Sequence, residues 1–289
     1  MVVDAYVMID EAKAAQPVSL ARHGAWSWQM PDGYAFALDW RSVAVTHIEA
    51  VSAASCFALV FVPGPTSIKP HVLLRRGSQG RSPFIGQDGQ WQAAWLPPRL
   101  AAWPFDLVEV PGGGHALALN EQSGLVSKGS GQHRMFTQSG GSPPILAPQT
   151  AQTAQTAQTA ALLKGHAEAL PATVRAAKAL RDLGLLAALD GDGCMLVVDA
   201  SVAATLDEAA VVTLHRSGAL GLLHAGLVSL AHLGWMAKAE RLLSAAPPPQ
   251  PLTSFNRKHR KAGAGFLTAL AADASADDAL TQFPGLTRQ

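Results

Sequence analysis

The chain has 289 residues, 48% of them hydrophobic and 15% charged, which is enough apolar sequence to bury a core without a disulfide or a structural metal. Its 22 Lys and Arg against 21 Asp and Glu leave a formal net charge of +1, so no overall field favours nucleic acid as a partner. The two cysteines, Cys56 and Cys194, lie in separate apolar stretches, which predicts buried, reduced thiols. Residues 1–16 lack the basic start and apolar stretch of a secretion signal, so we expect a cytoplasmic protein.

The first half of the chain alternates strand-like runs with turns. Residues 34–38 predict a buried strand or the entry to a strand, and residues 43–54 fit either a short helix or a strand. Residues 57–62, Phe-Ala-Leu-Val-Phe-Val, predict a central strand, which residues 71–74 repeat.

Two later segments have the pattern of β-hairpins. Residues 83–93 and 107–119 each place two apolar runs around a glycine-containing turn, Gly86-Gln87-Asp88-Gly89 in the first and Pro111-Gly112-Gly113-Gly114 in the second. The sequence therefore predicts an antiparallel, hairpin-built sheet.

The second half has the period of helices. A low-complexity insert of Gln-Thr-Ala repeats, residues 149–160, has no apolar stripe and predicts a polar helix extension or a disordered linker. From Ala172 onward, apolar residues recur at helical spacing. Thr205 and Glu208 form the pattern of a capping box, and Gly218 suits the end of that helix.

These elements predict an α+β fold. An antiparallel sheet from the N-terminal half packs against helices from the C-terminal half in one domain, residues 1–244. Residues 245–289 read as a proline-rich linker and a weakly helical tail.

One apolar stretch, residues 219–237, is about long enough to span a bilayer. It contains Gly221, Gly226 and Gly234 together with His224 and His232, and no membrane boundary precedes it. A buried core helix is favoured over a membrane contact.

No complete catalytic or metal-binding motif is present. His47 and Glu49 have the His-x-Glu spacing of zinc deaminases, but the Pro-Cys-x-x-Cys that would complete such a site is missing. The Pro-Gly-Gly-Gly loop lacks the Lys-Ser or Lys-Thr of a phosphate-binding loop. We therefore expect neither a metal nor another cofactor.

The aromatic residues Trp91, Trp95, Trp103 and Phe105, with Arg99 among them, are the best candidates for a recognition surface. Tryptophan is enriched at binding hot spots, but aromatics this close to strand signals commonly build the core. Both interpretations remain open on the sequence.

The order of several blocks resembles the SapC family. In the first half the matching blocks are 57–62, 84–91, 95–97 and 103–105, and in the second half they are 185–186, 196–199, 214–218 and 225–230. Three positions depart from the family pattern. Ala101-Ala102 replaces an arginine pair, Asn120 replaces an aspartate, and Gly226 replaces a histidine. The resemblance covers about residues 17–243 and implies a bacterial protein linked to surface-layer protein secretion, without an established reaction.

Two functions follow as expectations. The first is a non-enzymatic accessory protein that binds another protein through the tryptophan hairpin region, in connection with surface-layer export or assembly. The alternative is an enzyme or enzyme partner acting on a peptide or small molecule in a pocket between sheet and helices, lined by His215, Glu121 and Arg99, with Asp199 as a further catalytic candidate.

Overall fold

The computed structural model describes residues 15–77, 81–109, 115–129, 133–136, 151–189 and 193–245. The chain divides into two units, Met1–Ala246 and Pro247–Gln289, and the described residues all belong to the first. The predicted linker and tail therefore lie, apart from Ala245, outside the described residues.

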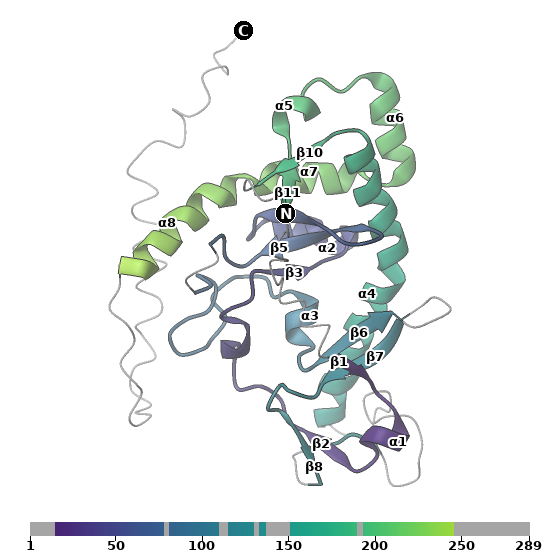
Figure 1. The fold of residues 1–289 in the computed structure, drawn as a ribbon, viewed down its shortest axis with the longest axis vertical. Helices are drawn as coiled ribbons and strands as arrows, with labels where there is room; N and C mark the ends of the chain where they lie inside the picture. Colours follow the sequence, from purple (N-terminus) through teal and green to yellow (C-terminus); the bar gives the residue numbers. More distant parts are fainter. Residues whose placement is uncertain are drawn as a thin grey trace, which may run out of the picture. The chain divides into compact units, whose positions relative to one another are not determined.

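A five-stranded sheet with the strand order β10-β11-β4-β5-β3 forms the centre of this unit (Figure 1). Every neighbouring pair is antiparallel. The strands are β3 (Ser42–Ala44), β4 (Leu59–Pro63), β5 (Ile68–Leu73), β10 (Leu186–Ala188) and β11 (Leu196–Val198). Leu59, Val60 and Phe61 of β4 are completely buried although successive side chains point to opposite faces, so both faces of this strand are covered. The prediction of a central strand at residues 57–62 is confirmed.

Two smaller antiparallel sheets lie together in the lower part of Figure 1. One has the order β1-β7-β6, and the other has the order β8-β2-β9. Their strands are β1 (Ala15–Pro17), β2 (Trp26–Trp28), β6 (Phe105–Glu109), β7 (His115–Asn120), β8 (Val126–Lys128) and β9 (His133–Arg134). Strands β6 and β7 pair as predicted for the hairpin at 107–119. A small core that includes Trp28, Phe105 and Leu119 holds these sheets together.

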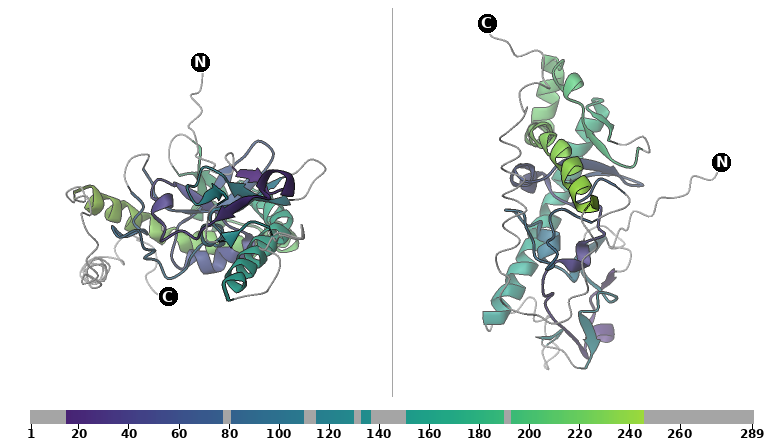
Figure 2. Two further views of the ribbon diagram at one scale, coloured as in Figure 1. Left: turned by 90° about the horizontal axis from the view of Figure 1, so that it is seen from below. Right: turned by 90° about the vertical axis from the view of Figure 1, so that its left-hand side faces the viewer.

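The helices come mostly from the second half of the chain. They are α1 (Leu20–His23), α2 (His47–Ala54), α3 (Pro98–Ala101), α4 (Ala151–Asp182), α5 (Ala200–Ala203), α6 (Glu208–Ser217), α7 (Leu220–Ser229) and α8 (Ala231–Ala245). Figures 1 and 2 show α4 as the long helix that runs beside both the five-stranded sheet and the β1-β7-β6 sheet. Antiparallel sheets with C-terminal helices confirm the α+β prediction, although β10 and β11 come from the second half.

Helices α2 and α7 pack side by side against one face of the five-stranded sheet. Leu59 of β4 donates its backbone N–H to the buried Ser229 Oγ at 3.0 Å. Gly226 lies so close to the sheet that a Cβ atom there would meet Val198 Cγ2 at 2.4 Å. The small side chains Ala50, Ala53 and Ala54 form the buried face of α2. Small residues therefore let both helices approach the strands closely.

Two local predictions in the first half are wrong, and a long-range contact explains the first of them. Residues 34–38 form a 3-10 turn at Ala35–Ala37 instead of a strand, because Tyr34 donates its N–H to the distant Gly89 carbonyl at 2.7 Å. Residues 83–93 turn back as predicted but pair only through one bridge, between Ile85 and Trp91, so no regular hairpin forms.

One helix start also differs from the prediction, whereas a second one confirms a predicted alternative. Asp207 caps α6, because its carboxylate accepts the Ala210 N–H at 2.7 Å, whereas the Thr205 hydroxyl donates to the Val202 carbonyl. Gly218 ends α6 in the left-handed conformation as predicted. Helix α4 begins at Ala151 and continues through Pro171, so residues 151–160 of the repeat are a helix extension.

The apolar stretch 219–237 falls in two helices, α7 and α8. By length and composition alone, Leu220–Leu243 could cross a membrane, and 33% of its most apolar window is buried. Cys56 and Cys194 form no disulfide in the described part of the chain, and both are half-buried instead of buried as predicted.

Candidate functional site

The catalytic candidates from the sequence do not come together. Asp199 caps α5, where its carboxylate accepts the Ser201 hydroxyl at 2.5 Å and the N–H groups of Ser201 and Val202 at 2.9 and 3.2 Å. The bond from the Ser201 hydroxyl, followed by the two N–H bonds, lowers the pKa of Asp199. His215 is exposed on α6. Glu121 follows β7 and bonds to α1, and Figure 1 shows α1 and α6 at opposite ends of the unit. Glu121 and His215 therefore cannot share one pocket in this conformation.

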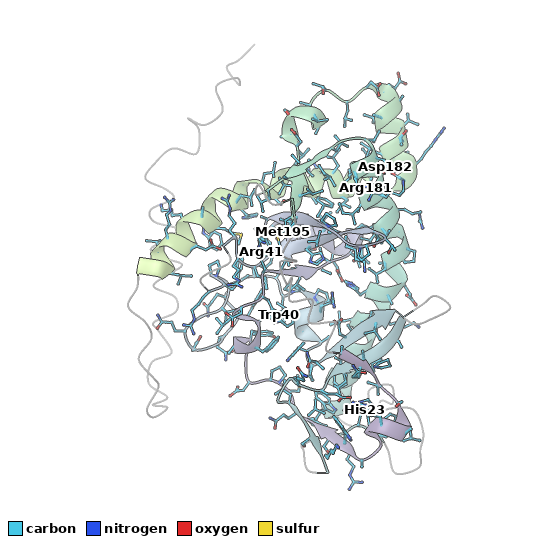
Figure 3. The ribbon with its side chains drawn as sticks, viewed as in Figure 1. His23, Trp40, Arg41, Arg181, Asp182 and Met195 are labelled. Carbon is cyan, nitrogen blue, oxygen red and sulfur yellow. The ribbon has the colours of Figure 1, made fainter. Side chains whose placement is uncertain are left out.

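Glu121 instead joins α1 to the end of β7. Its carboxylate receives the Arg22 guanidinium, with Nη2 at 2.8 Å from Oε2, and this bond lowers the pKa of Glu121. The fully buried His23, labelled in Figure 3, accepts the Ser19 N–H at Nδ1 (3.1 Å), so in the neutral ring Nε2 carries the proton and donates it to Glu121 (3.1 Å). All these bonds connect neighbouring parts of the fold, which is a structural role.

The predicted aromatic recognition residues lie mostly inside the protein. Trp103 and Phe105 are 7% and 2% exposed. Trp91 and Trp95 are half-buried and pack on the buried Phe57, with ring centroids at 6.0 and 6.1 Å. Trp91 also donates its indole N–H to the Trp95 carbonyl at 2.9 Å. These contacts are those of core residues.

Arg99, in contrast, belongs to an interior group of charged and polar side chains. From α3 it binds Asp106 of β6, with Nε at 2.9 Å from Oδ1. On β5, His71 lies near enough to Arg99, Lys69 and His166 to be influenced by their charges, and its Nδ1 is 3.1 Å from Ser42 Oγ. Burial, together with these cations, lowers the pKa of His71 to about 3. His71 is therefore a neutral imidazole at physiological pH.

His166 of α4 links this group to α2. Its Nδ1 lies 3.4 Å from the Glu49 carboxylate, which also accepts the Thr46 N–H at 2.7 Å. Burial raises the pKa of Glu49, but the bonds from His166 and Thr46 outweigh burial and hold that pKa below its ordinary value. We call the whole set the ionisable cluster, and its members are Glu49, Lys69, His71, Arg99, Asp106 and His166.

Beside the cluster, the tautomer of His47 follows from its partners. Thr173 donates its hydroxyl to the Ala169 carbonyl at 2.8 Å, so its oxygen can only accept from His47. It accepts the His47 backbone N–H at 3.1 Å and Nδ1–H at 2.8 Å. The Nε2 atom of neutral His47 is therefore left as a proton acceptor.

Only part of this arrangement was visible in the sequence. The His47-x-Glu49 pair was visible as a motif, but its partners Thr173 and His166 stand more than a hundred residues away. Such pairings exist only in the folded chain. Among the described residues, no group of three or more His, Cys, Asp or Glu could hold a metal ion.

The outer face of α2 and α7 is the other notable feature. Ile48 and Val51, one helical turn apart on α2, are both 62% exposed, and Val228 on the neighbouring α7 is 52% exposed. Because both helices lie on one side of the sheet, their solvent-facing sides form one surface. We call it the α2–α7 face (Ile48, Val51 and Val228).

A comparison with protein families finds one match: the family model described as SapC matches residues 18–235. No curated protein matches the chain. No solved structure matches it either.

Proposed function

Because the chain belongs to the SapC family, we propose that it is a non-enzymatic accessory protein that binds another protein in the cytoplasm. Cys56 and Cys194, which form no disulfide in the described part of the chain, suit a reducing compartment. The proposed connection with surface-layer export or assembly rests on the family resemblance. The proposed contact surface is the α2–α7 face, which replaces the tryptophan hairpin region because that region packs inward.

The observation that supports this proposal is the exposure of three β-branched apolar side chains on two neighbouring helices. Single exposed apolar residues are ordinary, but adjacent ones on rigid elements mark interaction sites. The same helices bury their other faces fully through Ala50, Ala53 and Gly226. The outward residues therefore contribute little to the core and are available to a partner.

The surroundings of the α2–α7 face indicate the chemistry of the partner. Ser52 and His224, also exposed on these helices, carry no fixed charge. A partner surface rich in ion-pairing groups would lose its solvation there without compensation. The expected occupant is an uncharged, apolar segment of a protein to be exported.

The test replaces the apolar side chains and follows contact and export together. A photo-crosslinking amino acid at Ser52 is expected to capture one exported protein in living cells, and the double variant Ile48→Gln/Val51→Gln is expected to lose both the adduct and surface-layer export. The control Val211→Gln/Val212→Gln changes two exposed valines on α6, 41% and 38% exposed, and should retain both. Equal behaviour of the two double variants, with unchanged thermal unfolding, would refute the α2–α7 face as the contact surface.

The ionisable cluster favours a second candidate, an enzyme or enzyme partner acting on a peptide or small molecule. Its support is that Arg99, the one cationic candidate from the sequence, lies near the neutral imidazole of His71 and the Glu49–His166 pair. Such a set can hold an anionic group and move a proton. If it does, the purified protein should deplete a compound from a metabolite or peptide extract, and His71→Asn should abolish the depletion. An extract left unchanged by the folded parent protein would count against the enzyme.

A further inference from the structure

Two tryptophans carry buried indole N–H groups that have no acceptor in the described part of the chain. They are Nε1 of Trp40, between the Ala35–Ala37 turn and β3, and Nε1 of Trp103, which follows α3. Trp91 shows the ordinary arrangement, since its N–H reaches the Trp95 carbonyl at 2.9 Å. The large majority of buried side-chain polar atoms in proteins find a partner, so two unpaired donors on neighbouring rings need an explanation.

The two indoles and Phe36 form one aromatic group, the Phe36–Trp40–Trp103 site. Phe36 stacks on Trp103 with centroids 5.0 Å apart and planes at 10°. Trp40 stands at 77° to Trp103 with centroids 5.2 Å apart, and at 70° to Phe36 at 5.5 Å. Figure 3 shows Trp40 in the middle of the unit.

Ring faces cannot satisfy both donors of the tryptophan pair. In a perpendicular pair only one ring can turn its edge toward the face of the other, so at most one of the two N–H groups can make an N–H···π contact with its neighbour. A buried donor without a partner destabilises a fold by about 1–3 kcal/mol. At least one indole therefore calls for an acceptor atom from outside the described chain.

The chemistry of the site restricts what that acceptor belongs to. Indole N–H groups only donate, so the incoming atom must accept, as a carbonyl or carboxylate oxygen does. The walls are flat aromatic rings, which favour a planar group stacked or edge-on against them. Trp103 is 7% exposed, whereas Phe36 and Trp40 are half-buried, so part of the aromatic wall lies at the surface of the described unit.

From these observations we propose that Phe36, Trp40 and Trp103 bind a small planar molecule through an acceptor oxygen held by the Trp40 and Trp103 indole N–H groups. The site shares no residue with the α2–α7 face, so this binding goes beyond the proposed protein contact and can fail or succeed independently of it. In this proposal Trp103 binds a small molecule from inside the protein, whereas the sequence predicted that it would bind another protein at the surface.

The test observes the two N–H groups directly. The seven tryptophans of the chain give seven indole signals in a ¹H–¹⁵N NMR spectrum, which single Trp→Phe variants assign. Benzamide and benzoate serve as probes with a neutral and a charged acceptor oxygen, and benzylamine is the control with the same ring and no acceptor oxygen. Benzamide, benzoate or both should shift the Trp40 and Trp103 signals saturably and leave the Trp26 signal in place, whereas benzylamine should shift neither.

Variants then separate the hydrogen bond from the aromatic wall. Trp103→Phe keeps a ring and removes the N–H, so affinity for the effective probe should fall by about 2-fold to 10-fold, the equivalent of one hydrogen bond. The matched control Trp26→Phe, on β2, should leave affinity unchanged.

Three results would overturn the proposal. One is the absence of saturable shifts with both acceptor probes, and another is an equal response to benzylamine. The third is a water molecule bound at both N–H groups. It would be seen as cross-peaks between the water protons and the two indole N–H protons that persist at high probe concentration. Because the signals are read on the unmodified chain, the titration decides even if Trp103→Phe does not fold.

Discussion

Gly226 controls how closely α7 approaches the five-stranded sheet. A Cβ atom there would meet Val198 Cγ2 at 2.4 Å and Val198 Cβ at 3.4 Å, and the stiff valine cannot turn away easily. We expect Gly226→Ala to lower the free energy of unfolding by about 1–3 kcal/mol in urea denaturation. On the same helix, a Cβ at the exposed Gly221 meets nothing within 4 Å, so Gly221→Ala should raise stability by about 0.5–1 kcal/mol. If Gly226→Ala and Gly221→Ala change the free energy of unfolding in the same direction, this account is wrong.

His71 makes stability depend on pH. Burial and the nearby cations lower its pKa from the ordinary 6.5 to about 3, so between these values the unfolded chain binds a proton that the folded chain does not. The free energy of unfolding should therefore fall as the pH drops below about 6.5, by up to about 1.4 kcal/mol per pH unit. Urea denaturation between about pH 7 and pH 4 should give His71→Asn a shallower slope than the parent, whereas the exposed His215→Asn should keep the parent slope. If the free energy of unfolding of His71→Asn falls with pH as steeply as that of the parent, His71 is not the cause of the pH dependence.

At the scale of elements, Thr173 fixes α2 against α4. Its oxygen accepts two hydrogen bonds from His47. Its hydroxyl hydrogen is donated to the Ala169 carbonyl within its own helix. Thr173→Val keeps the shape and leaves the His47 donors unpaired, which should reduce stability by about 1–3 kcal/mol.

Thr213 on α6 provides the matched control for that contact. Its hydroxyl makes the same bond within its helix, to the Ala209 carbonyl at 2.8 Å, but it is exposed. Thr213→Val should change stability by less than about 0.5 kcal/mol. If both valine variants lose the same amount, the bond within the helix, and not the contact between helices, carries the effect.

At the scale of the whole molecule, the described unit contains two cores of different size. The main core surrounds β4 and β5 and receives residues from α2, α4, α6, α7 and α8, whereas the core around Trp28, Phe105 and Leu119 has far fewer members. Opening the smaller core exposes less apolar surface. In native-state hydrogen exchange we expect the amides of β2 to open at a lower free energy than those of β4. Equal opening free energies would show that the two cores unfold as one.

Features that depend on residues close together in the sequence could be predicted, whereas features that depend on distant residues could not. The buried run of β4, the β6–β7 hairpin and the Gly218 cap depend on neighbouring residues, and all three were predicted correctly. The turn at 34–38 depends on Gly89, and the surrounding sequence could not reveal that bond.

The candidate sites show the same limit more strongly. His71, His166 and Thr173 look unremarkable in their own segments, and their partners come from other elements. Arg99 was predicted to share a pocket with Glu121 and His215, but its position beside Asp106 depends on a contact between α3 and β6 that only the fold shows. Trp103 was selected for its aromatic character, whereas its unpaired N–H is visible only in the structure.

Helix α4 connects the two cores, so its length sets how residues at one core are rotated about the helix axis relative to residues at the other. Its buried residues follow one another three or four positions apart along one stripe, from Leu163 in the smaller core to Leu180 in the main core, by way of His166, Leu170, Thr173 and Ala177. One residue inserted within this stripe would turn everything beyond it by about 100° relative to the other core. The Gln-Thr-Ala repeat precedes Leu163, so gaining or losing repeats leaves the phase between the cores untouched. Insertions or deletions before Leu163 therefore leave the two cores aligned, whereas those between Leu163 and Leu180 misalign them.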